Sequence, residues 1–271
     1  MGELRQIYAE NESESIARLI LEHAGYPLSA TLRDPEYIPP PLVIAQINEI
    51  VAEIHTGKPI QYILGYIYFC DLRIKVDKNV LIPRPETEEM VEQINASDTK
   101  SFRRIIDLGT GSGCIALALK QYYPDAEVWG VDINKGALKV AGENARKNKL
   151  GVNWGFLDLT DSPPLEQWEA FNLVVSNPPY VMENERELMD SNVTAFEPES
   201  ALFVEEEDPL IFYRAIAAFC TGHLEQDGEL WVEINEQLGR ETALLFEDMG
   251  FSEISILKDI HEKERFIHAR R

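Results

Sequence analysis

Residues 104–113 read RIIDLGTGSG, and residues 114–123 continue as CIALALKQYY. The first five residues have the apolar, β-branched character of a buried strand, and the second run is typical of a helix. Between them lie three glycines with the spacing Gly-x-Gly-x-Gly. Glycine adopts turn conformations that are closed to other residues, so the backbone can turn sharply and approach a ligand closely. The stretch therefore predicts a strand, a ligand-binding loop and a helix.

The sequence that follows alternates between strand-like and helix-like segments. Further strands are expected over AEVWGVD, VNWGFLD, FNLVVSN, GELWVEI, SEISILK and ERFIHAR, with helices over 135–148, 209–221 and 237–249. This alternation predicts an α/β fold with a doubly wound, mainly parallel, seven-stranded sheet. The short link Asp259–Lys263 between the last two strands predicts an antiparallel pair at the end.

Ahead of the sheet, residues 1–60 are expected to form a small helical domain. Asn11 and Glu14 have the spacing of a capping box in front of one apolar stripe, and a second helical stripe follows a proline-rich loop. Residues 61–84 contain two short alternating runs, which predict a β-hairpin linker. The sheet domain is then expected over residues 85–271.

The charge of the chain restricts its partners. The net charge is −22, and residues 183–208 hold ten Asp or Glu against one Arg. Because nucleic-acid binding depends on neutralising phosphates with Lys and Arg, such a chain is repelled by a polyanion at long range. The sequence therefore favours a basic protein partner over a nucleic acid, and we expect a monomer.

The composition also predicts the compartment. There is no run of about 18 apolar residues and no apolar segment near the N-terminus, so neither a membrane span nor a secretory signal is expected. Cys70, Cys114 and Cys220 are far apart and odd in number, which fits reduced, buried thiols better than disulfides or a metal site. Cys114, behind the glycine loop, could act as a nucleophile, but core packing is favoured. These features predict a cytoplasmic protein.

Acidic residues stand near the ends of the two strands after the glycine loop. Asp132 follows Gly113 by 19 residues, where a carboxylate can accept both hydroxyls of a ribose. Asp158 is expected to end the third strand, close to an adenine amino group. One such acid could simply cap a helix, and a lone glycine loop could be a tight turn. Together they predict a nucleoside-binding site.

The spacing of the glycines narrows the ligand. Dinucleotide-binding loops read Gly-x-Gly-x-x-Gly, whereas here the third glycine comes one residue earlier. The run DLGTGSG resembles the first motif of class I methyltransferases, which implies S-adenosylmethionine as cofactor. A cationic sulfonium also suits an acid-lined pocket better than a pyrophosphate does. By position, the loop residues expected at the cofactor are Gly109, Thr110, Gly111, Ser112 and Gly113.

The fourth strand is followed by Asn177-Pro178-Pro179-Tyr180. This tetrad could be a proline-stiffened turn, but ligands bind at the carboxyl ends of strands in such sheets. An amide nitrogen or a base amine is a poor nucleophile, because its lone pair is delocalised. The Asn177 side-chain oxygen and the Pro178 carbonyl can accept its two N–H groups, in a direction that the prolines fix, and Tyr180 can pack on the planar group. The proposed chemistry needs no metal and no covalent nucleophile.

Three further segments carry a closer resemblance. LIPRPETE at 81–88, FEPESAL at 196–202, and Gly65 followed by YIYF resemble segments of the HemK/PrmC protein-glutamine methyltransferases. The resemblance covers nearly the whole chain. It implies N5-methylation of the glutamine in the Gly-Gly-Gln motif of peptide chain release factors. It also implies that the cofactor is lined by Gly109 to Gly113, Asp132, Leu159 and Asn177, and that Asn177 to Tyr180 hold the glutamine. Leu159 stands where the family often has an aromatic residue.

Two charged residues of these segments are further candidates for substrate binding. Arg84 is either a cation that faces the partner or one half of a salt bridge to Glu86 or Glu88. Glu197 either contacts the substrate or holds the segment after the tetrad in place.

Three other functions compete with this interpretation. A sister enzyme that methylates a glutamine of a ribosomal protein shares the tetrad and the glycine loop. A DNA or RNA amine methyltransferase is disfavoured by the acidic charge and by the lack of a Lys- and Arg-rich recognition domain. A binding module that only keeps the fold would show no methyl transfer.

Overall fold

The computed structural model describes residues 2–26, 38–96, 102–161 and 168–271. The chain forms two compact units. The smaller comprises Met1–Tyr66 with Asp190–Phe196, and the larger comprises Ile67–Met189 with Glu197–Arg271. The hairpin expected as a linker thus groups mainly with the larger unit, and a segment of the C-terminal half groups with the N-terminal helices. No helix within the described ranges is long and apolar enough to cross a membrane.

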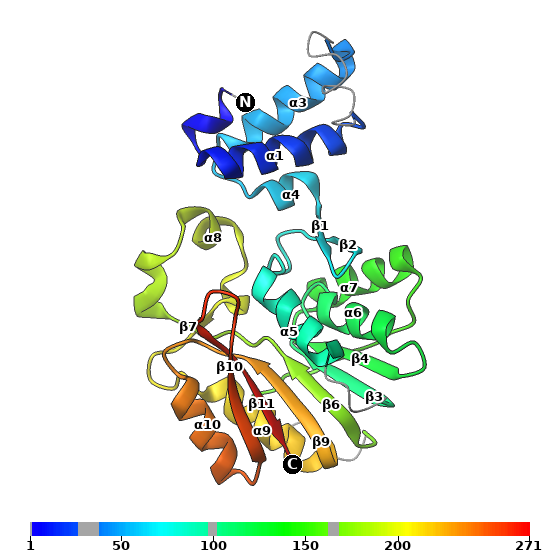
Figure 1. Ribbon diagram of the computed structural model, residues 1–271, viewed down its shortest axis with the longest axis vertical. Coiled ribbons are helices and arrows are strands. Elements are labelled where there is room, and N and C mark those ends of the chain that lie inside the picture. Colours follow the sequence, from blue (N-terminus) through cyan, green and yellow to red (C-terminus); the bar gives the residue numbers. More distant parts are fainter. Residues whose placement is uncertain (1, 27–37, 97–101, 162–167) are drawn as a thin grey trace. The chain divides into compact units, whose positions relative to one another are not determined.

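The smaller unit is helical (Figure 1). Its helices are η1 Leu4–Gln6, α1 Glu10–His23, α3 Pro41–Ile54, α4 Ile60–Leu64 and α8 Ser191–Phe196. The apolar faces of η1, α1, α3 and α4 meet in one core that includes Leu4, Ile16, Ile20, Ile50, Ile54 and Leu64. The predicted capping box is wrong: α1 begins at Glu10 behind Ala9, so Asn11 already lies inside the first turn and caps nothing.

The segment after the helices differs partly from the prediction. Residues 61–64 belong to α4 and not to a strand, because Pro59 starts a short helix that Gly65 ends with a φ of 77°. The expected hairpin then follows as β1 Tyr66–Phe69 and β2 Leu72–Lys75. Cys70 and Asp71 connect its strands with φ values of 47° and 62°, as a two-residue turn of type I′ requires.

The larger unit contains the predicted seven-stranded sheet. Its strands are β3 Arg104–Leu108, β4 Glu127–Asp132, β5 Asn153–Phe156, β6 Phe171–Ser176, β9 Leu224–Glu233, β10 Ser252–Lys258 and β11 Glu264–Arg270. The strand order is β10-β11-β9-β6-β3-β4-β5. β3, β4, β5, β6 and β9 run parallel, and β11 lies antiparallel between β9 and β10. The doubly wound sheet and its antiparallel final pair are therefore confirmed.

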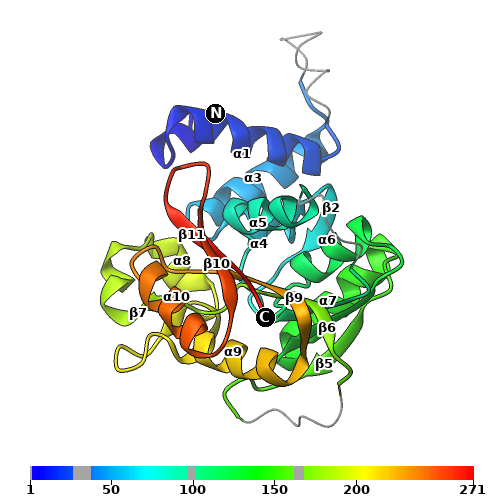
Figure 2. The ribbon, with the colours of Figure 1, turned by 60° about the horizontal axis from the view of Figure 1, so that its bottom comes forward.

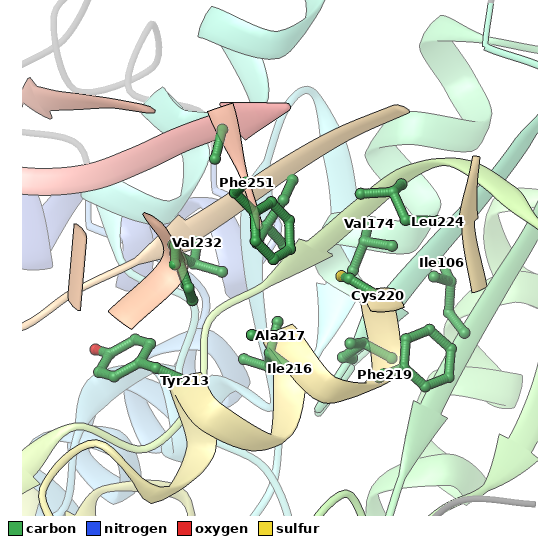
Figure 3. Close-up of a cluster of buried hydrophobic side chains, with 14 of the residues drawn as sticks. Ile106, Val174, Tyr213, Ile216, Ala217, Phe219, Cys220, Leu224, Val232 and Phe251 are labelled. Carbon is green, nitrogen blue, oxygen red and sulfur yellow. The ribbon is translucent and has the colours of Figure 1, made fainter. Parts of the chain in front are cut away.

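Helices cover both faces of this sheet (Figures 1 and 2). One face carries α5 Pro85–Ala96, α6 Cys114–Tyr122 and α7 Lys135–Asn148, and the other carries α9 Ile211–His223 and α10 Gly239–Asp248. Figure 3 shows Ile216 and Phe219 of α9 beside Val174 of β6 and Val232 of β9 in the buried core. Because side chains alternate along a strand, the neighbour of Val232, Glu233, lies on the opposite face of β9, toward α5.

The strand order places the glycine loop beside the tetrad. The chain winds outward from β3 through β4 to β5, and then from β6 to β9 on the other side, so the winding changes direction between β3 and β6. Such a switch point is where sheets of this kind bind ligands. Leu108 is in register with Ser176, whose hydroxyl donates a hydrogen bond of 2.7 Å to the Leu108 carbonyl. Gly109 and Asn177 consequently follow neighbouring strand ends.

The remaining short elements of the larger unit lie around the tetrad. They are β7 Val181–Met182, η2 Glu183–Leu188, η3 Glu199–Ala201 and β8 Phe203–Val204. β7 and β8 pair in parallel, with Val181 opposite Phe203 and Met182 opposite Val204.

Candidate active site

A cavity of about 440 Å³ lies at the carboxyl ends of the parallel strands. Most of the site residues predicted from the sequence line it: Gly109, Thr110, Gly111, Ser112, Asp132, Asp158, Leu159, Asn177, Pro178 and Pro179. The lining does not include Gly113, Tyr180, Arg84 or Glu197. It does include residues that the sequence analysis gave no role, such as Asn79, Thr87, Phe203, Glu205, Asp208 and Phe212.

The three loop glycines have two different functions. Gly109, Gly111 and Gly113 have φ values of 75°, 54° and 80°, which favour glycine at each position. Nothing lies within 4 Å of where a Cβ would stand at Gly109 or Gly111, so a ligand can approach their backbone. At Gly113 a Cβ would lie 2.8 Å from the Trp154 ring and 3.0 Å from the Ala141 methyl. Gly113 therefore permits helix packing behind the loop.

Asp132 is fixed by backbone amides at the end of β4. Its Oδ2 accepts a hydrogen bond of 2.8 Å from the Gly111 N–H, and its Oδ1 accepts one of 2.7 Å from the Asn134 N–H. Burial raises the pKa of Asp132, and these two hydrogen bonds oppose the rise. A carboxylate oxygen can accept a second hydrogen bond. Asp132 thus keeps the capacity that a ribose diol needs.

Asp158 differs slightly from its predicted place. β5 ends at Phe156, so Asp158 lies two residues beyond the strand in the cavity wall. Its Oδ1 accepts hydrogen bonds from the Thr160 N–H (2.9 Å) and the Thr160 hydroxyl (2.7 Å), which lower its pKa. The carboxylate is therefore ionised and locally anchored, and its contact with an adenine stays a prediction, as does that of Leu159.

The charges of the lining indicate the kind of ligand. The described residues that line the cavity include four carboxylates and no Lys, Arg or His; the acids are Asp132, Asp158, Glu205 and Asp208. A pyrophosphate would be repelled there, whereas a positively charged sulfonium or ammonium would be attracted. The acidic lining of the cavity therefore fits the positively charged S-adenosylmethionine, the cofactor that the motif resemblance implied.

Two negative observations apply to the described part of the chain. No group of three or more His, Cys, Asp or Glu in it could hold a metal ion. All three cysteines are unpaired and buried, as predicted. Burial raises the pKa of the Cys114 thiol to about 12, so the thiolate that a nucleophile needs is scarce at neutral pH. Packing is therefore the better explanation of Cys114.

The tetrad is held by a chain of side-chain hydrogen bonds. Asn177 Nδ2 donates to the Thr87 hydroxyl at 2.9 Å, and Thr87 Oγ1 donates to Glu233 Oε2 at 2.7 Å. The Tyr180 hydroxyl donates to the other oxygen, Oε1, at 2.9 Å. No described residue donates to Asn177 Oδ1, and Asn177 lines the cavity. This chain leaves Oδ1 able to accept a hydrogen bond from a substrate.

Thr87 and Glu233 were not among the predicted site residues. Thr87 is 2% exposed on α5, and Glu233 is 1% exposed at the end of β9. A signal for Glu233 was present, because an acid inside the apolar run GELWVEI must find buried partners if the run is a central strand. Nothing in the sequence indicates which partners those would be.

Tyr180 supports the site from outside the cavity. It packs against the larger core, and burial beside the Glu233 charge raises the pKa of its phenol well above the usual value. Tyr180 is therefore a hydrogen-bond donor at neutral pH. Its expected stacking on the substrate stays a prediction.

Of the two alternatives for Arg84, the salt bridge to Glu86 or Glu88 is wrong. Arg84 Nη2 pairs with Glu197 Oε1 at 2.7 Å, and the Ile82 N–H donates to Glu197 Oε2 at 2.9 Å. Glu88 instead accepts a hydrogen bond from the Cys70 N–H. Since the Glu197 side chain is 1% exposed, these contacts describe a clamp between segments 81–88 and 196–202. Direct substrate contacts of the two clamp residues stay predictions.

Comparisons with known proteins agree with this geometry. Residues 2–65 match the family model of the PrmC N-terminal domain, and residues 86–201 match that of the methyltransferase small domain. A release factor glutamine methyltransferase of Flavobacterium psychrophilum is 39% identical over 270 residues, which cover 97% of this chain and 94% of the relative. One of Bacteroides thetaiotaomicron is 40% identical over 226 residues, covering 83% and 81%.

Solved structures share the fold of the sheet domain. The Thermus thermophilus 16S rRNA N2 G1207 methyltransferase RsmC, in complex with AdoMet and guanosine, matches with a TM-score of 0.54 and 16% identity, over 76% of this chain and 49% of that one. A methyltransferase from Pyrococcus furiosus matches with a TM-score of 0.54 and 14% identity, over 73% and 88%. At these identities the likeness shows the fold alone.

The sheet order, the glycine loop and the acidic cavity define a class I methyltransferase that depends on S-adenosylmethionine. Sequence identity of 39–40% over most of the chain narrows the assignment from this class to one family. The chain belongs to the family of the release factor glutamine methyltransferases.

Proposed function

We propose that this chain transfers a methyl group from S-adenosylmethionine to the N5 side-chain amide of the glutamine in the Gly-Gly-Gln motif of peptide chain release factors. The names of its relatives support a release factor as substrate. The observation that carries the chemistry is Asn177, whose Nδ2 is held by Thr87 while its Oδ1 has no donor among the described residues. An acceptor held in this way suits the N–H of an amide.

The residues of the chain act by position and electrostatics. When bound, S-adenosylmethionine supplies a methyl group on a positively charged sulfur. Asn177 Oδ1 and the Pro178 carbonyl accept the two N–H groups of the glutamine amide, which localises the nitrogen lone pair. The glutamine nitrogen then gains the methyl group and releases one of its two protons to solvent. Because the prolines and the hydrogen-bond chain fix both acceptors beforehand, no reorganisation is needed during the reaction, and the barrier falls by on the order of several kcal/mol. The carboxylates of the lining favour the cationic cofactor over its neutral product.

The composition of the chain also supports a partner and a cellular compartment for the reaction. The net charge of −22 supports a basic protein partner and no direct contact with nucleic acid or a membrane surface. The three unpaired, buried cysteines support a reducing cytoplasm. We propose further that the enzyme acts as a monomer without a metal, since the tetrad chemistry requires only hydrogen-bond acceptors.

Labelled methyl transfer to a purified release factor tests the proposal. The matched substrate is the same release factor with the motif glutamine changed to alanine. Label on the first protein and none on the second is the expected result, and it identifies the reaction, the partner and the residue together.

Other outcomes point elsewhere. Label on both release factors would place the methyl group on another residue. No label on either, with cofactor binding confirmed by calorimetry, would reject the release factor. Ribosomal proteins and then nucleic acid would be tried next, the latter judged by binding that weakens steeply with salt.

A further inference from the structure

We propose that Thr87 and Glu233 are positioning residues that set the orientation of the Asn177 amide, and thereby decide that its oxygen and not its NH₂ faces the substrate. The inference rests on the proposed role of Asn177 as an acceptor. It assigns a function in the reaction to two residues that lie on α5 and β9, far from the tetrad in the sequence.

The hydrogen-bond chain ends at the buried carboxylate of Glu233. Glu233 Oε1 and Oε2 are 2.9 Å from the Tyr180 hydroxyl and 2.7 Å from the Thr87 hydroxyl. An ionised carboxylate only accepts hydrogen bonds, so both hydroxyls must donate to it. A hydroxyl has one proton, and Thr87 has therefore no proton left for Asn177.

The direction of the next hydrogen bond follows. Thr87 Oγ1 can only accept from Asn177, 2.9 Å away, and the amide group that donates is NH₂. An Asn amide has two orientations related by a half turn, and the hydrogen-bond network selects one of them. With NH₂ fixed on Thr87, the oxygen is left for the cavity. The reverse orientation would present N–H to the N–H of the substrate, which cannot form a hydrogen bond.

The protonation state of Glu233 is therefore coupled to the orientation of the Asn177 amide. A protonated Glu233 can donate to Thr87, whose own proton is then available for Asn177 Oδ1, and the acceptor for the substrate is lost. Burial raises the pKa of Glu233, while hydrogen bonds from Thr87 and Tyr180 oppose the rise. The titratable or charged groups that face Glu233 are Glu86 of α5, Tyr180 after the tetrad, Tyr213 of α9 and Arg265 of β11.

The main test is Thr87→Val, which removes the hydroxyl and keeps the shape. We expect kcat for release factor methylation to fall roughly 10- to 100-fold, because the reacting groups are misplaced and not removed. KM for the release factor and for S-adenosylmethionine should change far less. Thr87→Ser should restore most of the turnover, because it restores the hydroxyl.

Thr242→Val is the matched control. Thr242 is a fully buried threonine of α10 outside the cavity lining, and no described residue hydrogen-bonds to its hydroxyl. The same chemical change there should leave kcat unchanged. If Thr87→Val folds but is as active as the parent, the inference is wrong.

The pH profile separates positioning from a merely structural role. In the parent protein, kcat should fall as the pH drops through the pKa of Glu233. Thr87→Val should flatten this acid limb, because Asn177 is no longer coupled to the carboxylate. Tyr180→Phe removes a hydrogen bond that lowers the pKa of Glu233, so it should move the limb to higher pH.

The outcomes distinguish this inference from the proposed function. A parent protein that does not methylate the release factor refutes the function itself. An active parent whose acid limb is the same in Thr87→Val and Tyr180→Phe refutes the coupling. If Thr87→Val does not fold, the acid limb of Tyr180→Phe still decides the question: a shift to higher pH supports the coupling, and an unchanged limb refutes it.

Discussion

At one end of the cavity the protein presents backbone, and at the other end it presents side chains. The first end, where we propose that the cofactor binds and which we call the cofactor end, consists of the glycine loop 109–112 and Asp132. Asp132 is anchored by the Gly111 N–H only 21 residues away. The tetrad end consists of Asn177 to Pro179, held through Thr87 and Glu233. These contacts join residues 90 and 146 positions apart.

The difference shows two ways to preorganise a site. Backbone amides and glycine turns are fixed once a strand, a loop and a helix have formed in succession, so the cofactor end depends on local structure. The orientation of a side-chain amide has no local determinant and needs partners from other elements. We therefore expect substitutions at the cofactor end to change affinity and those at the tetrad end to change turnover.

Asn177→Ala should give the largest effect. It removes the acceptor, and we expect a loss in kcat of roughly 100-fold or more, by analogy with the loss of one preorganised polar group. The cofactor affinity and the melting temperature should change little, because the Thr87 hydroxyl can still donate to Glu233. Single-turnover kinetics with labelled cofactor measure the loss. Unchanged turnover would contradict the assignment of Asn177.

Asp132→Ala should have the next largest effect, and on a different quantity. It removes the proposed ribose contacts together with the anchors of Gly111 and Asn134, and cofactor binding should weaken by about 1–3 kcal/mol. Calorimetry with S-adenosylhomocysteine measures this. Asp132→Asn keeps one acceptor oxygen and should lose less. If Asp132→Ala binds the cofactor normally, or loses only kcat at saturating cofactor, the expectation that the cofactor end sets affinity and the tetrad end sets turnover is wrong.

Asp107→Asn should act on a third quantity, the change of stability with pH. Asp107 precedes the loop, and burial raises its pKa to about 7, against a hydrogen bond from Thr110. Its pKa in the unfolded chain is near 3.8, so the folded state binds the proton more tightly. The parent protein should therefore lose stability as the pH rises from about 4 to about 7, with a slope of at most about 1.4 kcal/mol per pH unit.

Urea unfolding of the cofactor-free proteins at pH 4.5 and pH 7.5, roughly the two ends of this transition, measures the slope. The stability of Asp107→Asn relative to the parent should rise between the two pH values. Asp158→Asn is the control, because the pKa of Asp158 is lowered and its stabilising effect is complete within this range. A relative stability of Asp107→Asn that does not vary with pH would contradict the raised pKa.

The two ends also differ in how far the sequence predicted them. The loop, Asp132 and the tetrad were found because their residues are close in sequence or follow recognisable strands, and the switch point between β3 and β6 brings them together. The predictions were wrong for short segments and at the end of a helix, where the local sequence pattern is too short to determine the structure. The helix over 60–64 is too short for a periodic pattern, and α1 starts one residue before the expected capping box.

The pairing of side chains was the least predictable feature. Arg84 had two acids within four residues, yet it pairs with Glu197, 113 residues away. Proximity in the sequence suggested the wrong partner. An exposed salt bridge between neighbours contributes little to stability, so proximity alone does not select it. The buried Glu197 needs a donor and obtains it from the element that packs against it.

The sequence by itself determined the parts of this protein that depend on order along the chain. These are the alternating α/β pattern, the glycine loop that permits left-handed turns, and the Asn-Pro-Pro-Tyr tetrad at a strand end. Only the tertiary structure decided whether the oxygen or the nitrogen of the Asn177 side chain faces the cavity. It also decided that Tyr180 lies outside the cavity and donates a hydrogen bond to Glu233. The physical reason is that the direction of a hydrogen bond is set by its partners, and Thr87 and Glu233 become partners of the tetrad only when α5 packs on the end of β9.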